Sequence, residues 1–261
     1  MSDTVLFELH TNGVGVITIN RPEVRNAINW EAMSALSKRV TEAEAIENLH
    51  AIILTGAGTK AFISGGDIKD LHTTPTREDA YQQHDLMTAT LGRLAELRIP
   101  VIAAMEGATR GGGCEVALAC DLRIAAQDAT LGFAQIKMGL TPGWGGARRL
   151  LSLVGYARAT EILLTGATLT APEAHVLGIV NHVTPKGEAF NVAMAMAERI
   201  LNGPKRAIRG VVEVLRTHIT QPYAEAVARE REVFASLWET DDHHEASSAF
   251  IEGRKPQFKD Q

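Results

Sequence analysis

Alternating strand-like and helix-like segments in the first half of the chain constrain its fold more than any other feature of the sequence. The β-branched run Gly13–Ile19 predicts a strand, which a turn signal at Asn20-Arg21-Pro22 ends. From Trp30 to Ile46 the apolar residues recur every three or four positions, as one face of a helix requires, and Asn29 suits the N-cap. Ala51–Thr55 then predicts a buried strand. This order favours an α/β fold in which helices cover a sheet.

The alternation gives way to helices after Gly146. A capping box at Thr170-Ala171-Pro172-Glu173, stopped by Gly178, predicts a short helix there. We therefore expect an α/β core over residues 1–200 and a helical C-terminal region over residues 201–261. The other expected elements are helices at 79–97, 114–120, 188–201, 204–217, 222–240 and 242–253, and strands at 101–105 and 122–125.

The composition excludes several classes of partner. The 261 residues include 26 Lys and Arg against 31 Asp and Glu, a net charge of −5, so the sequence calls for neither nucleic acid nor an anionic membrane. No run approaches the roughly 18 apolar residues of a membrane span, and residues 1–10 lack the apolar stretch of a secretory signal. Cys114 and Cys120 match neither a disulfide framework nor a zinc-ligand spacing. We expect a soluble, cytoplasmic protein without a metal site.

Two glycine-rich turns are candidate functional elements, because each follows a strand and leads toward a helix. Glycine lets a ligand approach the backbone closely, and an amide in the first helical turn lacks an internal partner and lies at the positive end of the helix dipole. Two such amides in one cleft would bind an oxygen that becomes negative during a reaction. Tight strand–helix packing explains the glycines equally well, so both interpretations stay open. The turns are Ala61-Phe62-Ile63-Ser64-Gly65-Gly66-Asp67-Ile68 and Glu106-Gly107-Ala108-Thr109-Arg110-Gly111-Gly112-Gly113-Cys114-Glu115.

Two other glycine motifs fit less well. The chain has no G-x-x-x-x-G-K-[ST] phosphate loop, and Gly143-Trp144-Gly145-Gly146 does not make G-x-G-x-x-G. Ser64 is not set in the G-x-S-x-G elbow of serine hydrolases. Phosphate-loop and serine-hydrolase chemistry are therefore disfavoured.

Five sequence blocks share their order and spacing with a known family over nearly the whole chain. They are Gly15–Pro22 with Arg25–Asn29, then Ala61–Ile68, Gly107–Asp121, Pro142–Gly146 and Phe250–Phe258. They resemble the enoyl-CoA hydratase/isomerase (crotonase) superfamily. The resemblance implies a spiral of ββα units followed by a helical trimerisation region, in a homotrimer or a homohexamer. It also implies an acyl-CoA thioester substrate, of which coenzyme A is part, and no metal or redox cofactor.

The resemblance also implies particular site residues. The backbone amides of Gly66 and Gly112 match the two donors that hold the thioester oxygen. Arg254 and Lys255, with Phe250, resemble a segment that reaches CoA, often that of a neighbouring subunit. The family commonly has lysine where Gly253 stands, so the contact would come from Arg254 or Lys255. The positions that match those binding the nucleotide and pantetheine of CoA are Arg25, Ala27, Ser64, Gly65, Asp67 and Ile68.

The reaction depends on two further positions. Hydratases of the family use two glutamates as general acid and base; Glu115 matches the first, and the second falls at Gln135. An amide cannot exchange a proton near neutral pH, although it can hold water or a carboxylate. Three alternatives therefore stay open: hydration with Glu115 alone as acid/base, decarboxylation of a methylmalonyl- or ethylmalonyl-type thioester, and silent acyl-CoA binding. Isomerisation is disfavoured, because it often relies on the missing glutamate.

One more segment bears on these alternatives. Lys137-Met138-Gly139 with Pro142–Gly146 resembles the decarboxylating branch, which has tryptophan at the position of Trp144. Trp144 and Met138 are expected to shape the acyl pocket, although Trp144 is equally suited to filling a core. His84 and Tyr81 lie on the expected helix 79–97, which passes near that pocket in relatives; we expect them to be ordinary, partly exposed residues.

Overall fold

Two mixed β-sheets frame the protein in the computed structural model, which describes residues 3–259. The larger sheet has the strand order β1-β2-β3-β5-β7-β10, with β1 antiparallel to β2 and the other neighbours parallel. The α/β class expected from the sequence is confirmed. The strands of this sheet are β1 (Val5–Leu9), β2 (Val14–Ile19), β3 (Ala51–Gly56), β5 (Val101–Met105), β7 (Leu122–Ala126) and β10 (His182–Thr184).

The second sheet consists of strands of three residues and was not predicted. Its order is β4-β6-β8-β9, parallel except for the β8–β9 pair. Each strand is too short to show a period-two pattern, and each pairs with residues far away in the sequence. The strands are β4 (Ala61–Ile63), β6 (Ala108–Arg110), β8 (Thr130–Gly132) and β9 (Thr168–Thr170).

Successive strand pairs wind between the two sheets as a spiral. The pairs β3–β4, β5–β6 and β7–β8 each contribute one strand to either sheet, and helical segments follow each pair. This is the ββα spiral that the family resemblance implied. The segments are α2 (Ile68–Leu71) and α3 (Arg77–Glu96) after the first pair, α4 (Gly112–Ala119) after the second, and η2 (Ala134–Met138) and α5 (Gly146–Thr165) after the third.

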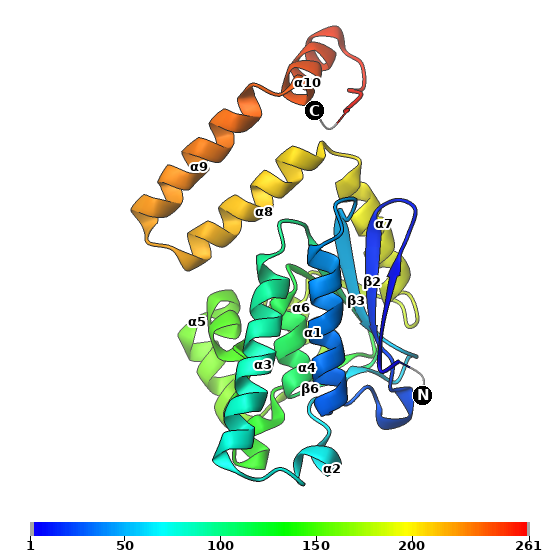
Figure 1. Cartoon of the computed structure of the whole chain (residues 1–261), viewed down its shortest axis with the longest axis vertical. Helices are drawn as coiled ribbons and strands as arrows, with labels where there is room; N and C mark the ends of the chain where they lie inside the picture. The colour runs from blue at the N-terminus through cyan, green and yellow to red at the C-terminus, as the bar shows by residue number, and fades with distance from the viewer. Residues whose placement is uncertain (1–2, 260–261) are drawn as a thin grey trace.

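The larger sheet is covered on both faces, as parallel strands require. Successive side chains of β3 point to opposite faces: Ile53 packs among residues of α7 (Ala189–Leu201), whereas Ile52 and Leu54 belong to the main core with α1 (Trp30–Glu44), α3 and α4. Figure 1 shows α1 and α3 on one side of the sheet and α7 on the other. The main core therefore lies between this sheet and helices α1, α3 and α4.

Two predicted helix starts are confirmed in atomic detail. The Asn29 side chain accepts a hydrogen bond from the Ala32 amide at 3.0 Å, which caps α1. The Thr170 hydroxyl and the Glu173 carboxylate form the expected capping box of α6 (Ala171–Val176).

Three C-terminal helices extend from the core, as Figure 1 shows. They are α8 (Lys205–Thr220), α9 (Tyr223–Trp238) and α10 (Asp241–Glu252). Helix α8 is tied back to the core by Arg216, whose guanidinium donates to both carboxylate oxygens of Asp121 at 2.8 and 2.7 Å and to the Leu97 carbonyl. The division into a core at 1–200 and a helical region at 201–261 stays a prediction.

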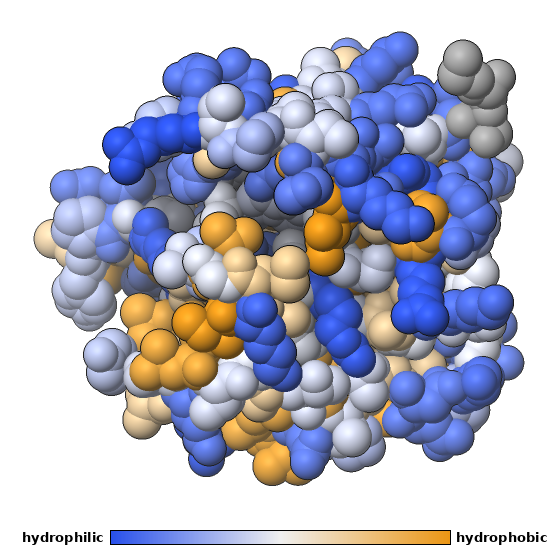
Figure 2. Space-filling view, turned by 90° about the horizontal axis from the view of Figure 1, so that it is seen from below, coloured by the Kyte–Doolittle hydropathy of each residue, from blue (hydrophilic) through white to orange (hydrophobic). Residues whose placement is uncertain are grey.

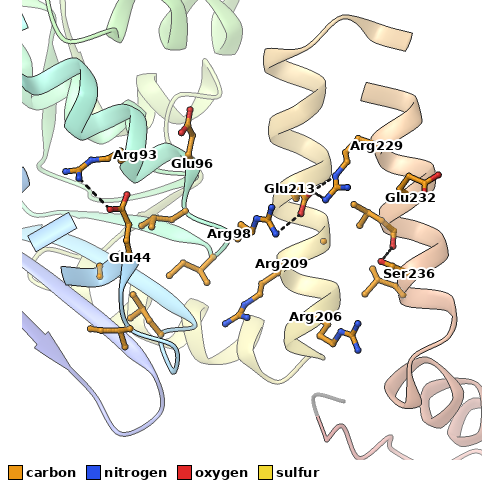
Figure 3. Close-up of a pocket in the computed structure, with 18 residues that line it drawn as sticks. Glu44, Arg93, Glu96, Arg98, Arg206, Arg209, Glu213, Arg229, Glu232 and Ser236 are labelled. Atoms are coloured by element: carbon orange, nitrogen blue, oxygen red, sulfur yellow. Dashed lines mark hydrogen bonds and ion pairs between the residues drawn. The ribbon is translucent and has the colours of Figure 1, made fainter. Parts of the chain in front are cut away.

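A cavity of about 890 Å³ separates the α8–α9 hairpin from the ends of α1 and α3. Charged side chains line much of it, and Figure 3 shows Arg93 paired with Glu44 and Arg98 paired with Glu213. It does not include the residues of the two glycine turns. Among the helices of residues 3–259, none is both long and apolar enough to span a membrane.

Candidate functional site

The first glycine turn follows β4 and lies beside the segment that precedes α1. The Ile28 amide donates to the Gly65 carbonyl at 2.8 Å, and the Asp67 amide donates to the Ile28 carbonyl at 2.9 Å. These two bonds flank Gly66 and hold its peptide in place. Gly65 has a φ of +99°, a conformation that favours glycine.

The second glycine turn joins β6 to α4 and closes against the first. A Cβ added at Gly113 would lie 2.1 Å from the Ile63 carbonyl oxygen, so only glycine lets α4 approach β4 this closely. A Cβ added at Gly65 would lie 3.0 Å from the Arg110 carbonyl oxygen and 3.6 Å from the Gly112 nitrogen. The two turns therefore converge, with Gly112 as the first residue of α4.

Glu115 lies on the same helix, three residues after Gly112, and its side chain is buried. One carboxylate oxygen accepts hydrogen bonds from Gln135 Nε2 at 3.0 Å and from the Gly143 amide at 3.2 Å. The other accepts from the amides of Trp144 at 2.7 Å and Gly146 at 2.8 Å. The four acceptor positions of the carboxylate are thus filled. Glu115 also places its negative charge at the N-terminus of α5, where a helix favours it.

Gln135 follows β8 on η2 and meets Glu115 as its sequence position implied. Its Nε2 faces the carboxylate, whereas its Oε1 is buried and has no hydrogen-bond partner within residues 3–259. An acceptor in this state carries a desolvation cost of about 1–3 kcal/mol. The pair therefore presents one satisfied carboxylate and one unsatisfied amide oxygen.

The turn at Pro142–Gly146 supplies donors that the sequence analysis did not assign. Its amides bind Glu115, and its Gly143 carbonyl accepts a hydrogen bond from His84 Nδ1 at 2.6 Å. His84 is exposed, as expected, but it contacts the segment that holds Glu115. The glycines of this turn were the sequence signal that could have pointed to these donors, because a residue without a side chain leaves its amide accessible to a carboxylate.

The residues expected at the CoA nucleotide and pantetheine gather around the first turn. The Ser64 amide donates to the Arg25 carbonyl at 3.2 Å, Ala27 is buried, and Ile68 is 59% exposed. Asp67 is already paired: Arg21 Nη1 donates to its carboxylate at 3.0 Å. Sequence reasoning missed this arginine.

The tail residues expected at CoA lie elsewhere in the single chain. Figure 1 shows α10 and α2 at opposite ends of the molecule. Phe250, on α10, is 87% exposed. Arg254 forms ion pairs with Glu245 and Glu252, which raise its pKa above the usual value. One chain therefore does not bring these residues to the glycine turns.

Other reactive side chains near the site are shielded. Burial raises the pKa of the Cys114 thiol, next to Glu115, to about 12, so it stays protonated and inert. Across residues 3–259, no group of three or more His, Cys, Asp or Glu side chains is placed to hold a metal ion. The polar groups around the buried Glu115 carboxylate are therefore the Gln135 amide and backbone amides.

A buried carboxylate beside two converging glycine turns, on a ββα spiral, is the arrangement of an acyl-thioester enzyme fold. The enoyl-CoA hydratase/isomerase family model matches residues 10–261, and this chain belongs to that family. It is 40% identical over 256 residues to "Probable enoyl-CoA hydratase echA8" of Mycobacterium bovis, covering 98% of each chain. It is 37% identical over 242 residues to "Short-chain-enoyl-CoA hydratase" of Clostridium acetobutylicum, covering 93% and 92%. The enoyl-CoA hydratase structure of Bacillus anthracis superposes with a TM-score of 0.92 at 32% identity, covering 99% and 100%.

Proposed function

We propose that this protein hydrates 2-enoyl-CoA thioesters, adding water across the double bond next to the thioester. The observation that supports the proposal most strongly is the position of Glu115. It lies on the same face of α4 as Gly112, and its carboxylate accepts a hydrogen bond from Gln135. Relatives whose names denote enoyl-CoA hydratases, matched over nearly the whole chain, support the same reaction.

The amides of Gly66 and Gly112 are the proposed donors to the thioester oxygen. Attack of water on the β-carbon moves electrons through the double bond onto this oxygen, where an enolate forms. Each donor in such a site is worth about 2.7–4 kcal/mol of transition-state stabilisation. The convergence of Gly65 on the Gly112 nitrogen supports a shared oxygen site for the two turns.

Glu115 is the proposed general base and then the general acid. It takes a proton from water as the oxygen bonds to the β-carbon, and it returns a proton to the α-carbon as the enolate collapses. Since its four acceptor positions are filled, one donor must leave before water binds. Gln135 Nε2 is the side-chain donor and moves most easily, while Gln135 Oε1 then accepts from the water.

CoA binding at the first turn follows from the residues gathered there. Arg25 and Ser64 would contact the nucleotide phosphates, and the apolar Ile68 would contact pantetheine. Ala27 and Gly65 shape the backbone beside it. Asp67 is proposed to act with Arg21, whose guanidinium it orients.

An apolar surface beside Gln135 suits an acyl chain. Ile136, Met138 and Leu140 are 42%, 55% and 63% exposed on the segment that follows β8. Figure 2 shows several apolar patches, the largest at its lower left, on a face that is otherwise mainly hydrophilic. We propose that an apolar acyl group covers Met138 and its neighbours.

A homotrimer or homohexamer is proposed from the C-terminal helices. Val211, Leu215 and Ile219 recur every four residues on α8 and are each more than half exposed. Such an apolar stripe favours burial against another subunit. Assembly would let Phe250 and Arg254 reach CoA on a neighbouring subunit, and it would make residues 201–261 an oligomerisation region.

We also propose a cytoplasmic location for the protein.

Decarboxylation of a malonyl-type thioester is the second candidate. The filled Glu115 carboxylate favours it, because loss of CO₂ needs the enolate-stabilising amides but no base to remove a proton. A neutral Gln135 would not repel the leaving carboxylate.

Two assays separate these reactions. Crotonyl-CoA is incubated with the protein, and hydration is followed as loss of the conjugated enoyl absorbance. Methylmalonyl-CoA and ethylmalonyl-CoA are incubated in parallel, and CO₂ is measured. We expect turnover with crotonyl-CoA. Release of CO₂ without hydration would favour the second candidate, and tight acyl-CoA binding in a thermal-shift assay without either reaction would indicate a silent binder.

A further inference from the structure

The peptide unit between Gly143 and Trp144 has a hydrogen bond at each end. Its carbonyl oxygen, on Gly143, lies 2.6 Å from His84 Nδ1. Its N–H group, on Trp144, donates to the Glu115 carboxylate at 2.7 Å. His84 lies on α3 and Glu115 on α4, so this one peptide joins side chains of two helices. Two hydrogen bonds in series therefore connect His84 to Glu115.

The carbonyl partner of His84 determines which of its ring nitrogens bears a hydrogen. A carbonyl oxygen only accepts hydrogen bonds, so Nδ1 of His84 must be the donor to Gly143. His84 is exposed, and this contact does not use its other ring nitrogen. His84 therefore acts on the turn as a hydrogen-bond donor at Nδ1.

A donor at the carbonyl of a peptide strengthens the N–H group of the same peptide as a donor. Hydrogen bonds in such a chain polarise one another, by about 10–30% per bond. The Trp144 N–H makes the shortest of the four hydrogen bonds to Glu115, at 2.7 Å against 2.8, 3.0 and 3.2 Å for the others. The contact with His84 therefore acts on the donor that approaches the carboxylate most closely.

Helix α3 holds the turn at a second point, which does not act through the same peptide. Arg149, on α5, donates to the Leu91 carbonyl on α3 at 3.1 Å and to the Trp144 carbonyl at 3.2 Å. The Trp144 carbonyl belongs to the next peptide unit, so Arg149 anchors the turn without polarising the Trp144 N–H. His84 both anchors the turn and polarises a donor to Glu115.

We propose that His84 is a positioning residue, which holds the Glu115 carboxylate in its reactive orientation through the peptide unit that joins them. The inference rests on the proposed function, which makes Glu115 the general base and acid. His84 donates to the protein backbone and acts through it. Loss of this donor weakens the shortest hydrogen bond to Glu115 and loosens the turn that supplies three of its four donors.

Two substitutions of His84 separate its hydrogen bond from the presence of a side chain. The amide nitrogen of asparagine is bonded to Cγ, as Nδ1 is in histidine, so His84→Asn keeps a donor near the same place. His84→Leu removes the donor. With crotonyl-CoA we expect His84→Leu to lower kcat about tenfold, the effect of losing one hydrogen bond, with KM nearly unchanged. His84→Asn should keep kcat within about threefold of the wild type.

Gln82→Leu is the matched control for these variants, because Gln82 is an exposed residue of the same helix. It is expected to keep the wild-type kcat. A wild-type kcat in His84→Leu would overturn the inference. Equal losses in His84→Leu and His84→Asn would overturn it as well, since the hydrogen bond would then not be the cause.

NMR of the Trp144 amide tests the inference without turnover. The chain has three tryptophans, so labelling of tryptophan alone gives few backbone signals, and Trp144→Phe identifies the signal of Trp144. We expect His84→Leu to move the Trp144 amide proton upfield, because its hydrogen bond to Glu115 weakens, and His84→Asn to return it toward the wild-type position. An unmoved signal in His84→Leu would overturn the inference whatever the reaction. If the signal moves as expected but the wild type hydrates no enoyl-CoA, the proposed function fails while the dependence of Glu115 on His84 stands.

Discussion

The Glu115 carboxylate and the Gln135 amide face each other across 3.0 Å, with the nitrogen of Gln135 toward the carboxylate. This contact puts a neutral group where a second acid would otherwise stand. The distance means that any carboxylate introduced at position 135 must share a proton with Glu115, since like charges this close do not both ionise.

Gln135→Glu is expected to raise the hydration rate of crotonyl-CoA about tenfold or more, because a second proton-transferring group adds general acid/base catalysis. The rate is measured by loss of enoyl absorbance. The shared proton should also give the variant a new limb in its pH–rate profile. Gln135→Met removes the amide without adding an acid and should lower the rate. If Gln135→Glu hydrated crotonyl-CoA at the wild-type rate, residue 135 would take no part in the reaction.

Glu115→Gln is expected to lower kcat by about 100-fold or more while nearly keeping CoA affinity, because the proton acceptor is lost. It should also destabilise the fold by about 1–3 kcal/mol, since the new amide nitrogen cannot accept from the backbone donors. Turnover and thermal unfolding measure the two effects separately.

Glu106 offers a matched control for that stability effect. It is 6% exposed and accepts hydrogen bonds from the Gly187 and Ala189 amides at the start of α7. Glu106→Gln should therefore destabilise the protein similarly without a comparable loss of kcat. Equal losses of kcat in the two variants would show that Glu115 acts only by holding structure.

The sequence predicted the elements whose patterns are long enough to show a period. Helix α1, with its Asn29 cap, and strands β3 and β5 were expected within a few residues of their observed bounds. Gln135 was placed beside Glu115 from family spacing, and the structure shows the two in contact. Whether they act as proposed stays a prediction.

What the sequence could not show depends on backbone atoms that meet only in three dimensions. Strand β1 (VLFEL) alternates in burial over its first four residues, but its residue types do not alternate between apolar and polar, and the second sheet pairs three-residue strands through distant partners. The glycines at 143 and 146 mark a turn, but nothing in the sequence indicates that their amides bind Glu115. Arg21 was missed because nothing in its local pattern indicates that Asp67 is its partner.

Two glycine-to-alanine substitutions in helices should shift stability in opposite directions. In α3, a Cβ at Gly92 meets nothing within 4 Å, so Gly92→Ala should stabilise by about 0.5–1 kcal/mol. This would raise Tm by about 1–4 °C in calorimetry. In α4, a Cβ at Gly113 would collide with the Ile63 carbonyl, so Gly113→Ala should destabilise by about 1–3 kcal/mol or more. The same sign of Tm change in both variants would contradict the packing described here.

Acid should release the C-terminal tail from α10. Hydrogen bonds from Arg254 and from the Gln257 amide lower the pKa of Glu245 from 4.5 to about 2. Because the pKa of Glu245 is lower in the folded state, the charged carboxylate stabilises the contact fully at pH values above its ordinary pKa of 4.5. This stabilisation is lost as the pH falls from about 4.5 toward 2. NMR of the Arg254 and Gln257 amides should follow this loss, and Glu245→Gln should weaken its pH dependence, while the Lys259 amide stays bonded to Asp242. A tail that stays ordered to pH 2 in the wild type would refute the linkage.

Arg216 is expected to control how firmly the C-terminal helices are attached to the core. Its guanidinium binds both Asp121 oxygens, and the Asp121 carboxylate also accepts from the Val101 amide at 2.8 Å, so the pair joins α8 to the start of β5. Arg216→Met should cost about 1–3 kcal/mol, because it leaves a half-buried carboxylate without its charged partner. Hydrogen exchange should quicken in α8 and α9 more than in β3 and β5, since the core strands keep their own packing. Lys186→Met breaks the exposed pair with Asp128 and should leave exchange unchanged. Uniformly faster exchange over the whole chain in Arg216→Met would instead show that the helices and the core unfold as one unit.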